Sequence, residues 1–477
     1  MKFKTFLAGC LGGLLSLNSC TNSPDMTDYA AYVNPFIGTG GHGHTFPGAI
    51  VPHGMISPSP DTRIDGWDAC SGYYYADSTI NGFSHTHLSG TGCCDYGDVL
   101  LMPTVGEQKY LPTGSQSQQM AYASAFSHQN ETAEPGYYSV FLDTYQVKAE
   151  LTASKRAAIH RYTFPESKEA GFILDLDYSL QRQTNKEMEI EVISPTEICG
   201  RKKTMYWAFD QYINFYAKFS KPFTYTLVTD SMALDDGGRL LPTCKALLHF
   251  DTTKDEQVFV KVGISAVDIE GARKNVETEI PDWDFDGIRK DARKAWNETL
   301  SKIDITTNDK DDETIFYTAL YHTAISPNLF TDVDGRYLGM DLQVHQGDTL
   351  NPMYTIFSLW DTFRALHPLM TIIDPDLNNA FIRSLIKKHQ EGGIFPMWDM
   401  ASNYTGTMIG YHAVPVIVDA YMKGDRNFDI QEAYRACVRA AEYDTTGIKC
   451  PDLVLPHLMP KAKYYKNSIG YVPCDRE

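Results

Sequence analysis

The sequence predicts a β-sandwich domain followed by an all-α domain. From about residue 32 to residue 267, apolar and polar side chains alternate, which is the period of half-buried strands. After Pro281, apolar side chains recur every three or four positions, which is the period of amphipathic helices. A chain of 477 residues has room for two or three domains, so the change of period indicates a domain boundary.

The first twenty residues predict a bacterial lipoprotein export signal. Lys2 and Lys4 precede an apolar run over residues 6–17, which is too short to span a bilayer. The run ends in a lipobox-like Leu-Asn-Ser-Cys sequence. We therefore expect an exported lipoprotein in the periplasm or at the cell surface, anchored to the outer membrane. The predicted parts are a signal peptide over residues 1–19, a lipidated Cys20 and a tether over residues 20–31.

We predict that the first domain covers residues 32–275. Its strands are predicted from the alternation of apolar and polar side chains. Val147, Ala149 and Leu151 alternate with Lys148 and Glu150, as expected for a strand with one buried face. Turn residues separate such runs, which favours an antiparallel sandwich. Further strands are expected at residues 171–176, 187–192, 205–215 and 257–262.

Helices are predicted from residue 276 onward. Ala292, Trp296 and Leu300 lie on one face of a linker helix expected over residues 276–305. Residues 306–477 are expected to be all-α, with loops that contain Gly, Pro or Asn. The predicted helices cover residues 312–324, 358–373, 377–390, 407–423 and 430–443.

Composition narrows the class of ligand. The chain has 42 basic and 60 acidic residues, a net charge of −18, and no basic run, so nucleic acid and anionic membrane surfaces are excluded as partners. An aromatic content of 12% favours stacking on sugars or other flat rings. Cys450 and Cys474 form a candidate disulfide, with free buried thiols as an equal alternative.

Residues 34–62 hold six glycines, five prolines and three histidines. The pairs His42/His44 and His85/His87 each place two imidazoles on one side of an extended chain, which is half of a metal site. A closed zinc site needs about four ligands and the chain has no HExxH motif, so hydrogen bonds to backbone or to sugar hydroxyls are favoured. A histidine-bound metallohydrolase stays open as a weaker hypothesis.

The run Ser358-Leu-Trp-Asp-Thr-Phe-Arg364 has the residue types of a sugar clamp. Trp360 offers a flat apolar face, while Asp361 and Arg364 lie three apart on one helical face and each can bond hydroxyls. A buried helix start with an Asp–Arg ion pair explains the same residues equally well, and both interpretations stay open.

Four long segments resemble a known family. They are YVNPFIGTGGHGHTFPGAIVPHGM, GFSHTHLSGTGCCDYGD, SLWDTFRALHPLMT and MWDMASNYTGTMIGYHAVPVIVDAYMKG. They are similar to glycoside hydrolase family 92, the calcium-dependent exo-acting α-mannosidases of glycan-degrading bacteria. The resemblance implies a β-sandwich followed by an (α/α)6 barrel, with the active site where the two domains meet.

The resemblance also implies a reaction. Terminal α-mannose, with α-1,2 as the expected linkage, would be removed from N-glycans or mannan with inversion, by two carboxyl groups roughly 6.5 to 9.5 Å apart. Ca2+ would hold mannose hydroxyls through oxygen-rich coordination. The residues implied to line the mannose pocket are His42, Phe46, Trp67, Trp360, Asp361 and Arg364, with Trp67 as the aromatic wall of the leaving-group subsite.

The chain departs from the family pattern at the catalytic motifs. The EGNxWQ motif with the general acid and the GNDDxG-like motif with the base are absent. We expect both carboxyl groups and the calcium ligands beyond residue 477, and residues 306–477 to form only the first part of the barrel. The alternative function is a surface lipoprotein that binds mannose-containing glycans without cleaving them.

Overall fold

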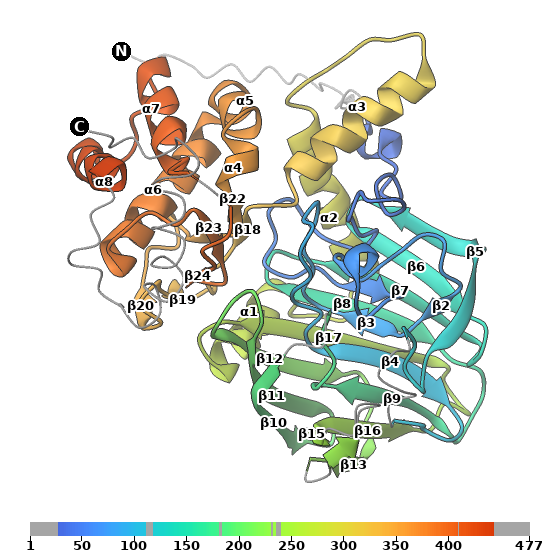
Figure 1. The fold of residues 1–477 in the computed structure, drawn as a ribbon. Helices are drawn as coiled ribbons and strands as arrows, with labels where there is room; N and C mark the ends of the chain where they lie inside the picture. Colours follow the sequence, from blue (N-terminus) through green and yellow to red (C-terminus); the bar gives the residue numbers. More distant parts are fainter. Residues whose placement is uncertain are drawn as a thin grey trace, which may run out of the picture.

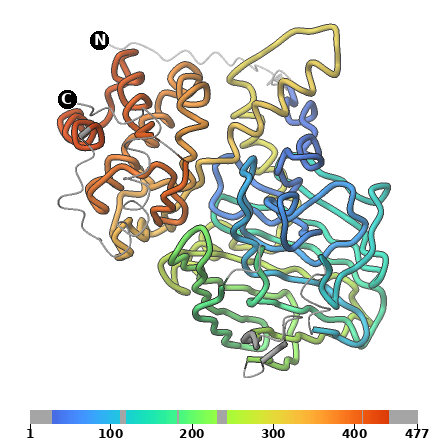
Figure 2. The backbone as a smooth tube through the Cα atoms, in the orientation of Figure 1, coloured from blue at the N-terminus to red at the C-terminus, as the bar shows by residue number. Residues whose placement is uncertain are grey.

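A computed structural model describes residues 27–110, 118–180, 184–229, 232–234, 240–408 and 410–442. It has a sheet-rich part followed by a helical part (Figures 1 and 2), which confirms the predicted order of the two fold types. None of its helices within those ranges is long and apolar enough to cross a membrane. The predicted signal peptide, Cys20, most of the tether and the Cys450–Cys474 pair lie outside the described residues.

Two antiparallel sheets form the sandwich. The six-stranded sheet has the order β1 (Ser59–Asp61), β3 (Gly82–Ser84), β4 (Leu100–Val105), β9 (Ala170–Asp175), β16 (Lys245–Phe250) and β13 (Thr224–Val228). The nine-stranded sheet has the order β10 (Thr184–Ser194), β11 (Glu197–Met205), β12 (Gln211–Phe219), β17 (Gln257–Ser265), β8 (Ala157–Thr163), β7 (Val147–Ala153), β6 (Tyr137–Leu142), β5 (Ser124–Glu134) and β2 (Thr79–Ile80). Met232–Leu234 (β14) and Leu240–Pro242 (β15) make a separate two-stranded pair.

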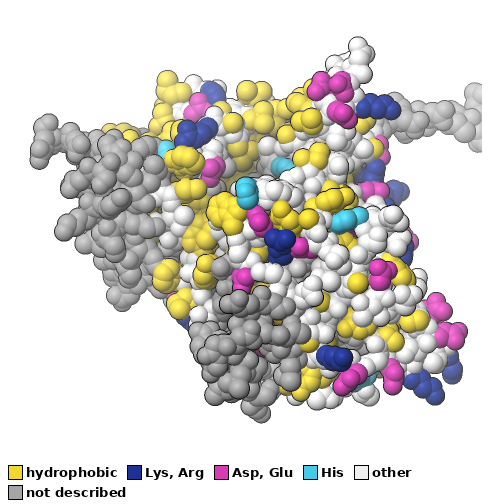
Figure 3. All heavy atoms as spheres, turned by 45° about the vertical axis from the view of Figure 1, so that its right-hand side comes forward, with side chains coloured by type: hydrophobic (Ala, Val, Ile, Leu, Met, Phe, Trp, Pro, Cys, Tyr) yellow, Lys and Arg dark blue, Asp and Glu magenta, His cyan; other side chains and the backbone are white. Residues whose placement is uncertain are grey.

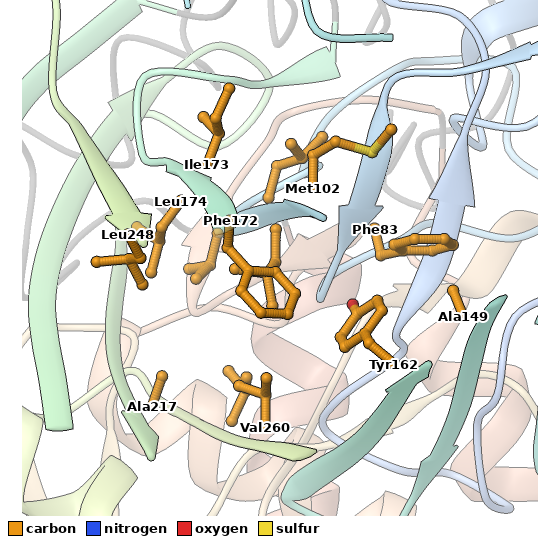
Figure 4. Packing of buried hydrophobic residues seen from close by; sticks show 14 of the residues in the cluster. Phe83, Met102, Ala149, Tyr162, Phe172, Ile173, Leu174, Ala217, Leu248 and Val260 are labelled. Atoms are coloured by element: carbon orange, nitrogen blue, oxygen red, sulfur yellow. The ribbon is translucent and has the colours of Figure 1, made fainter. Parts of the chain in front are cut away.

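Aromatic side chains fill the space between the two sheets. Phe172 of β9 meets Tyr162 of β8 edge to face, with ring centroids 4.9 Å apart. Phe83 of β3 lies within 6.2 Å of the same tyrosine ring (Figure 4). All three side chains are buried. Burial of such large apolar surfaces is the main source of stability for a sandwich and fixes how its loops are presented.

The strand predicted over residues 205–215 is interrupted. β11 ends at Met205 and β12 begins at Gln211, with a turn between them. The buried carboxylate of Asp95 accepts the backbone N–H groups of Trp207 and Ala208 at 3.0 and 3.1 Å. Because these N–H groups bond a side chain, they are not available to a neighbouring strand.

The region predicted as one linker helix contains two helices. α1 spans Ile269–Glu279 and α2 spans Phe285–Leu300, with Pro281 in the connection. Asp284 caps α2 by accepting the N–H of Gly287 at 2.9 Å. Ala292, Trp296 and Leu300 are buried, in agreement with the predicted apolar face of this helix.

Up to residue 442, where the described part ends, six further helices form the second part. Short strands accompany them, so this part is mainly rather than purely helical. The helix predicted over residues 358–373 is divided into α4 (Leu359–Thr362) and α5 (Leu366–Ile373), and the one predicted from residue 407 begins only at Ala413. The helices are η1 (Tyr29–Tyr32) and η2 (Trp67–Ala69) in the first part, and α3 (Lys310–Thr323), α4 (Leu359–Thr362), α5 (Leu366–Ile373), α6 (Pro375–Gly392), α7 (Ala413–Lys423) and α8 (Ile430–Glu442) in the second. The short strands are β18 (Asn328–Leu329), β19 (Arg336–Leu338), β20 (Val344–Gln346), β21 (Tyr354–Thr355), β22 (Phe357–Ser358), β23 (Trp398–Met400) and β24 (Asn403–Tyr404).

The segment from residue 46 to residue 55 joins the sandwich to the helices. The indole N–H of Trp296 donates to the carbonyl of Ile50 at 2.6 Å. The Asn328 amide donates to the carbonyl of Gly54 at 2.8 Å, and the ring of His53 bonds the carbonyl of Pro327 at 2.8 Å. The proline-rich end of this segment is therefore held at the domain junction.

Candidate functional site

The glycine-rich stretch folds into a tight rim on the sandwich. The N–H of Thr45 donates to the carbonyl of Gly38 at 3.2 Å and brings Gly43 against the same residue. A Cβ atom on Gly43 would lie 2.3 Å from the carbonyl oxygen of Gly38, so only glycine fits at position 43. This close approach of the backbone explains the local glycine content without invoking phosphate binding.

The rim presents His42 and Trp67 to solvent. The Trp67 side chain is 56% exposed, and its indole Nε1 lies 3.1 Å from Nδ1 of His42. The Nδ1 atom is also 3.0 Å from the carboxylate of Asp68. A Cβ atom on Gly92 would lie 2.4 Å from the Trp67 ring, so glycine at position 92 lets the ring rest on the neighbouring loop. Figure 3 shows one face on which histidine, acidic and basic side chains adjoin one another among hydrophobic ones.

A second group of polar side chains lies at the start of α4. Ser358 of β22 pairs with Trp398 of β23, and the Trp398 indole N–H donates to the Ser358 hydroxyl at 2.6 Å. The Ser358 hydroxyl in turn donates to the carboxylate of Asp361 at 2.5 Å. Asp361 is exposed, so its remaining lone pairs face solvent and can accept ligand hydroxyls.

Trp360 and Arg364 lie against each other beside this carboxylate. The guanidinium of Arg364 is 4.4 Å from the centroid of the Trp360 ring, and its Nε donates to the carbonyl of Trp360 at 3.2 Å. Asp361 and Arg364 are both exposed and, among the described residues, no ion pair joins them. The alternative of a buried Asp–Arg pair therefore does not describe this helix start.

His412 places a buried, neutral ring behind the same surface. Its imidazole stacks on Phe363 with ring centroids 4.2 Å apart and an interplanar angle of 3°. Burial, with a smaller contribution from the nearby Arg364 guanidinium, lowers the pKa of His412 to about 4. The imidazole is therefore neutral at neutral pH and adds no charge beside Asp361.

Trp207 links the sandwich to this group. Its ring stacks on the ring of Trp398 with centroids 4.3 Å apart, and its indole N–H donates to the hydroxyl of Thr407. Next to it, the side chain of Asn403 exchanges two hydrogen bonds with the backbone of Asp210, at 2.9 and 3.0 Å. The sandwich therefore supports Trp398, which supports Ser358 and through it the carboxylate of Asp361.

A small cavity lies between the two parts of the molecule. Its volume is about 40 Å3, and its lining includes His87, Tyr96 and Gln211 from the sandwich and Ile356 and Ala401 from the helical part. That volume holds a few water molecules but no hexose ring.

The predicted site residues on the surface fall into two groups by their contacts. Trp360, Asp361 and Arg364 share one surface, and His42 and Trp67 share the sandwich rim. Within the described ranges, no hydrogen bond, ion pair or ring contact joins the two groups.

Phe46 is placed behind the site and not on its surface. Its side chain has no exposed area and packs in one cluster with Trp296 and Tyr321. Its ring centroid is 5.1 Å from that of His87. The Phe46 ring therefore supports the rim from inside, and its placement leaves no face for a sugar.

His85 and His87 are bonded inside the sandwich. Nδ1 of His85 donates to the carbonyl of Val99 at 2.6 Å. Nδ1 of His87 bonds the carbonyl of Ser57 at 2.7 Å, and its Nε2 lies 2.8 Å from the Asp61 carboxylate. Both histidines are buried, and protein groups bond both ring nitrogens of His87 and the Nδ1 of His85, whereas the Nε2 of His85 has no hydrogen-bond partner.

The described residues do not fit calcium. Ca2+ takes six to eight oxygen ligands. Among the residues that the structure describes, the single cluster of three metal-ligating side chains contains two imidazoles, from His42 and His44, and one carboxylate, from Asp68. Imidazoles are poor ligands for a hard cation, so no step of the reaction is assigned to calcium here.

Comparison with known proteins identifies the family. Residues 32–265 match the model of the glycosyl hydrolase family 92 N-terminal domain, and residues 271–477 match the model of the glycosyl hydrolase family 92 catalytic domain. The fold and its junction surface thus define a two-domain protein of the glycosidase class. The chain belongs to glycosyl hydrolase family 92.

Three solved structures and one curated protein are similar. The chain has 36% identity and a TM-score of 0.82 with the family GH92 α-mannosidase BT3965 of Bacteroides thetaiotaomicron, over 89% of this chain and 58% of that one. For the inverting mannosidase BT2199 of the same species, the identity is 30% and the TM-score 0.76, over 88% and 56% of the two chains. The GH92 glycosyl hydrolase ccman5 matches at 28% identity and a TM-score of 0.74, over 87% and 57%.

The curated relative is an uncharacterised secreted glycosidase of Arthroderma benhamiae. It is 26% identical over 94% of this chain and 55% of its own length. The chain therefore spans somewhat more than half the length of the relatives it matches.

Proposed function

We propose that the protein is an exo-acting glycosidase that removes terminal α-linked mannose with inversion. Membership of family 92 supports a glycosidase, and the similar solved structures are named as α-mannosidases, one of them inverting. One of these relatives was solved in complex with mannoimidazole. The observation that carries the proposal is the group of half-buried Trp360 and exposed Asp361 and Arg364 at the start of α4.

Each side chain of this group has a defined role in the proposal. The Trp360 ring offers an apolar face for the sugar ring. The Asp361 carboxylate, oriented by the Ser358 hydroxyl, accepts hydrogen bonds from sugar hydroxyls, and the Arg364 guanidinium donates to them. These residues bind and orient the terminal sugar, and we assign the general acid and the general base to no residue of this chain.

The finer parts of the proposal rest on the family resemblance and on the sequence. We propose mannose-containing glycans, N-glycan or mannan, as substrates, with α-1,2 as the preferred linkage and calcium as the cofactor. We also propose export as a lipoprotein through Cys20 to the outer membrane or cell surface. The name of the curated relative, a secreted glycosidase, supports export alone.

Proton NMR of a reaction with α-1,2-mannobiose tests the proposal. A protein that carries both catalytic carboxyl groups together with residues 1–477 should release mannose whose first-formed anomer is β, because inversion changes the configuration of an α-linked sugar. Asp361→Asn should reduce the rate about tenfold or more, because it weakens a charged hydrogen bond to the sugar. The exposed turn residue Asp348 gives a matched control, since Asp348→Asn should leave the rate unchanged.

The same experiment separates the proposal from its alternative. Binding of mannobiose without release of mannose would favour a glycan-binding protein. An α anomer formed first would contradict inversion, and full activity of Asp361→Asn would contradict the role given to this carboxylate.

A further inference from the structure

Three side chains of metal-ligating type converge on the sandwich rim. His42, His44 and Asp68 each offer one ligand atom, and these three atoms all lie within 4.8 Å of one another. His42 and His44 come from the glycine-rich rim, and Asp68 comes from η2. Glycosidic bond cleavage as proposed above uses none of these three side chains.

Two neighbours make opposite demands on the Nδ1 atom of His42: one requires a lone pair on this atom and the other requires a proton. The indole N–H of Trp67 points at this atom from 3.1 Å, which requires a lone pair on Nδ1. The Asp68 carboxylate lies 3.0 Å from the same atom, which requires a proton on Nδ1. A cation held by the Nδ1 lone pair and the Asp68 carboxylate would remove this conflict, and the Trp67 indole N–H would then turn to another acceptor, because a single lone pair cannot serve both.

His44 provides the second, independent observation. Only 7% of the residue is exposed, and its Nε2 has no hydrogen-bond partner. The ring also bonds the backbone of Thr91. A metal-bound histidine typically has this arrangement, in which one ring nitrogen bonds a backbone group and the other is available to the metal. An unpartnered buried ring nitrogen is otherwise unfavourable.

We propose that His42, His44 and Asp68 bind a divalent transition-metal ion, with Zn2+ as the best match. Two imidazoles and one carboxylate suit zinc, and the same three ligands leave a fourth position for water or for a ligand hydroxyl. Because Trp67 borders the site, that fourth position would lie beside an exposed aromatic face. The inference concerns the sandwich domain alone and does not depend on the proposed hydrolysis.

Isothermal titration of the metal-free full chain with Zn2+ tests this inference. We expect one zinc ion per chain at this site, and no competition from Ca2+ in large excess, because calcium prefers oxygen ligands. His42→Ala and Asp68→Asn should each weaken zinc binding about tenfold or more. The His42 side chain is 74% exposed, so its replacement tests the site without disturbing the core.

The chain offers a matched control pair. His345 and Asp341 form another histidine–carboxylate contact, at 2.9 Å, but no third ligand of this kind joins them among the described residues. His345→Ala should therefore leave zinc binding unchanged. Cys93 follows Gly92, which lies against the Trp67 ring, so its thiol is an alternative zinc ligand to test, and Cys93→Ser should also leave zinc binding unchanged.

Three results would overturn the inference. The first is the absence of zinc binding by the wild-type chain. The second is wild-type affinity in both His42→Ala and Asp68→Asn. The third is loss of zinc binding in Cys93→Ser alone, which would place the ion on thiols.

Discussion

At the scale of single residues, the candidate sugar-binding surface depends on side chains that do not themselves face the ligand. Asp361 takes its orientation from Ser358, and Ser358 is held by the Trp398 indole at 2.6 Å. Trp398 is 1% exposed, so it contributes support and no ligand contact. Contacts of this kind, made by residues behind a binding side chain, restrict its rotamers and fix its position more precisely.

Replacement of Ser358 tests this support. Ser358→Ala removes the hydroxyl that orients Asp361 and leaves the Trp398 indole N–H without its partner, so affinity for an α-mannoside should fall about fivefold to tenfold. Ser358→Thr keeps the hydroxyl and should restore most of the affinity. Titration calorimetry with methyl α-mannoside measures both. Equal affinity of wild type and Ser358→Ala would show that Asp361 needs no such support.

The sequence predicted which residue types form the candidate site. It did not predict which neighbouring side chains hold them in place. The flat ring, the carboxylate and the guanidinium at positions 360, 361 and 364 are visible in the sequence because they stand close together. The contact between Ser358 and Trp398 joins two strands of two and three residues that lie 40 positions apart. Strands this short carry no readable period.

At the scale of elements, α2 connects the sheet-rich part to the helical part through its buried face. Its buried face carries Trp296, whose ring lies 4.4 Å from that of Tyr321 on α3 and whose indole bonds Ile50 at the junction. The apolar spacing predicted this face correctly. Its partners were not predictable, because they come from the glycine-rich segment and from α3.

Trp296→Ala should weaken this attachment. The substitution opens a cavity in a fully buried position and removes a hydrogen bond, so the free energy of unfolding should fall by about 3–5 kcal/mol. Urea unfolding curves measure the change. As a control, Trp67→Ala removes a tryptophan that is 56% exposed and should change the free energy of unfolding by no more than about 0.5 kcal/mol. Similar losses in both variants would contradict the role of α2 as the attachment.

Two elements depart from the predicted pattern, each for its own physical reason. The strand over residues 205–215 is interrupted because Asp95, more than 100 positions earlier, takes its backbone N–H groups. The linker divides in two near Pro281. The break near Pro281 has a local cause that the sequence shows. The contact with Asp95 is tertiary, so it cannot be seen from the residues that neighbour the strand in the sequence.

At the scale of the whole molecule, buried histidines make stability depend on pH. Burial lowers the pKa of His53, at the domain junction, and of His85, in the sandwich, to about 4. Between pH 4 and 6.5 the unfolded chain therefore binds more protons at these sites than the folded chain. Their contribution to stability is present above about pH 6.5 and is lost as the pH falls toward 4.

The variant His85→Gln isolates one of these histidines. Between about pH 7 and about pH 5, the free energy of unfolding of the wild type should fall by about 2 kcal/mol more than that of the variant. Burial raises the pKa of Asp95 to about 7, which has the opposite sign, but this effect is common to both proteins and cancels in the comparison. Equal losses in the two proteins would show that His85 does not titrate as its burial predicts.

The central claim is that the surface over residues 358–364 binds a terminal α-mannose. Saturation-transfer difference NMR with methyl α-mannoside tests it directly and needs no catalysis. We expect transfer from the wild-type chain to the mannoside ring protons, strong loss of this transfer in Trp360→Ala, and little transfer to methyl α-galactoside. Undiminished transfer from Trp360→Ala would place the sugar elsewhere and contradict the claim.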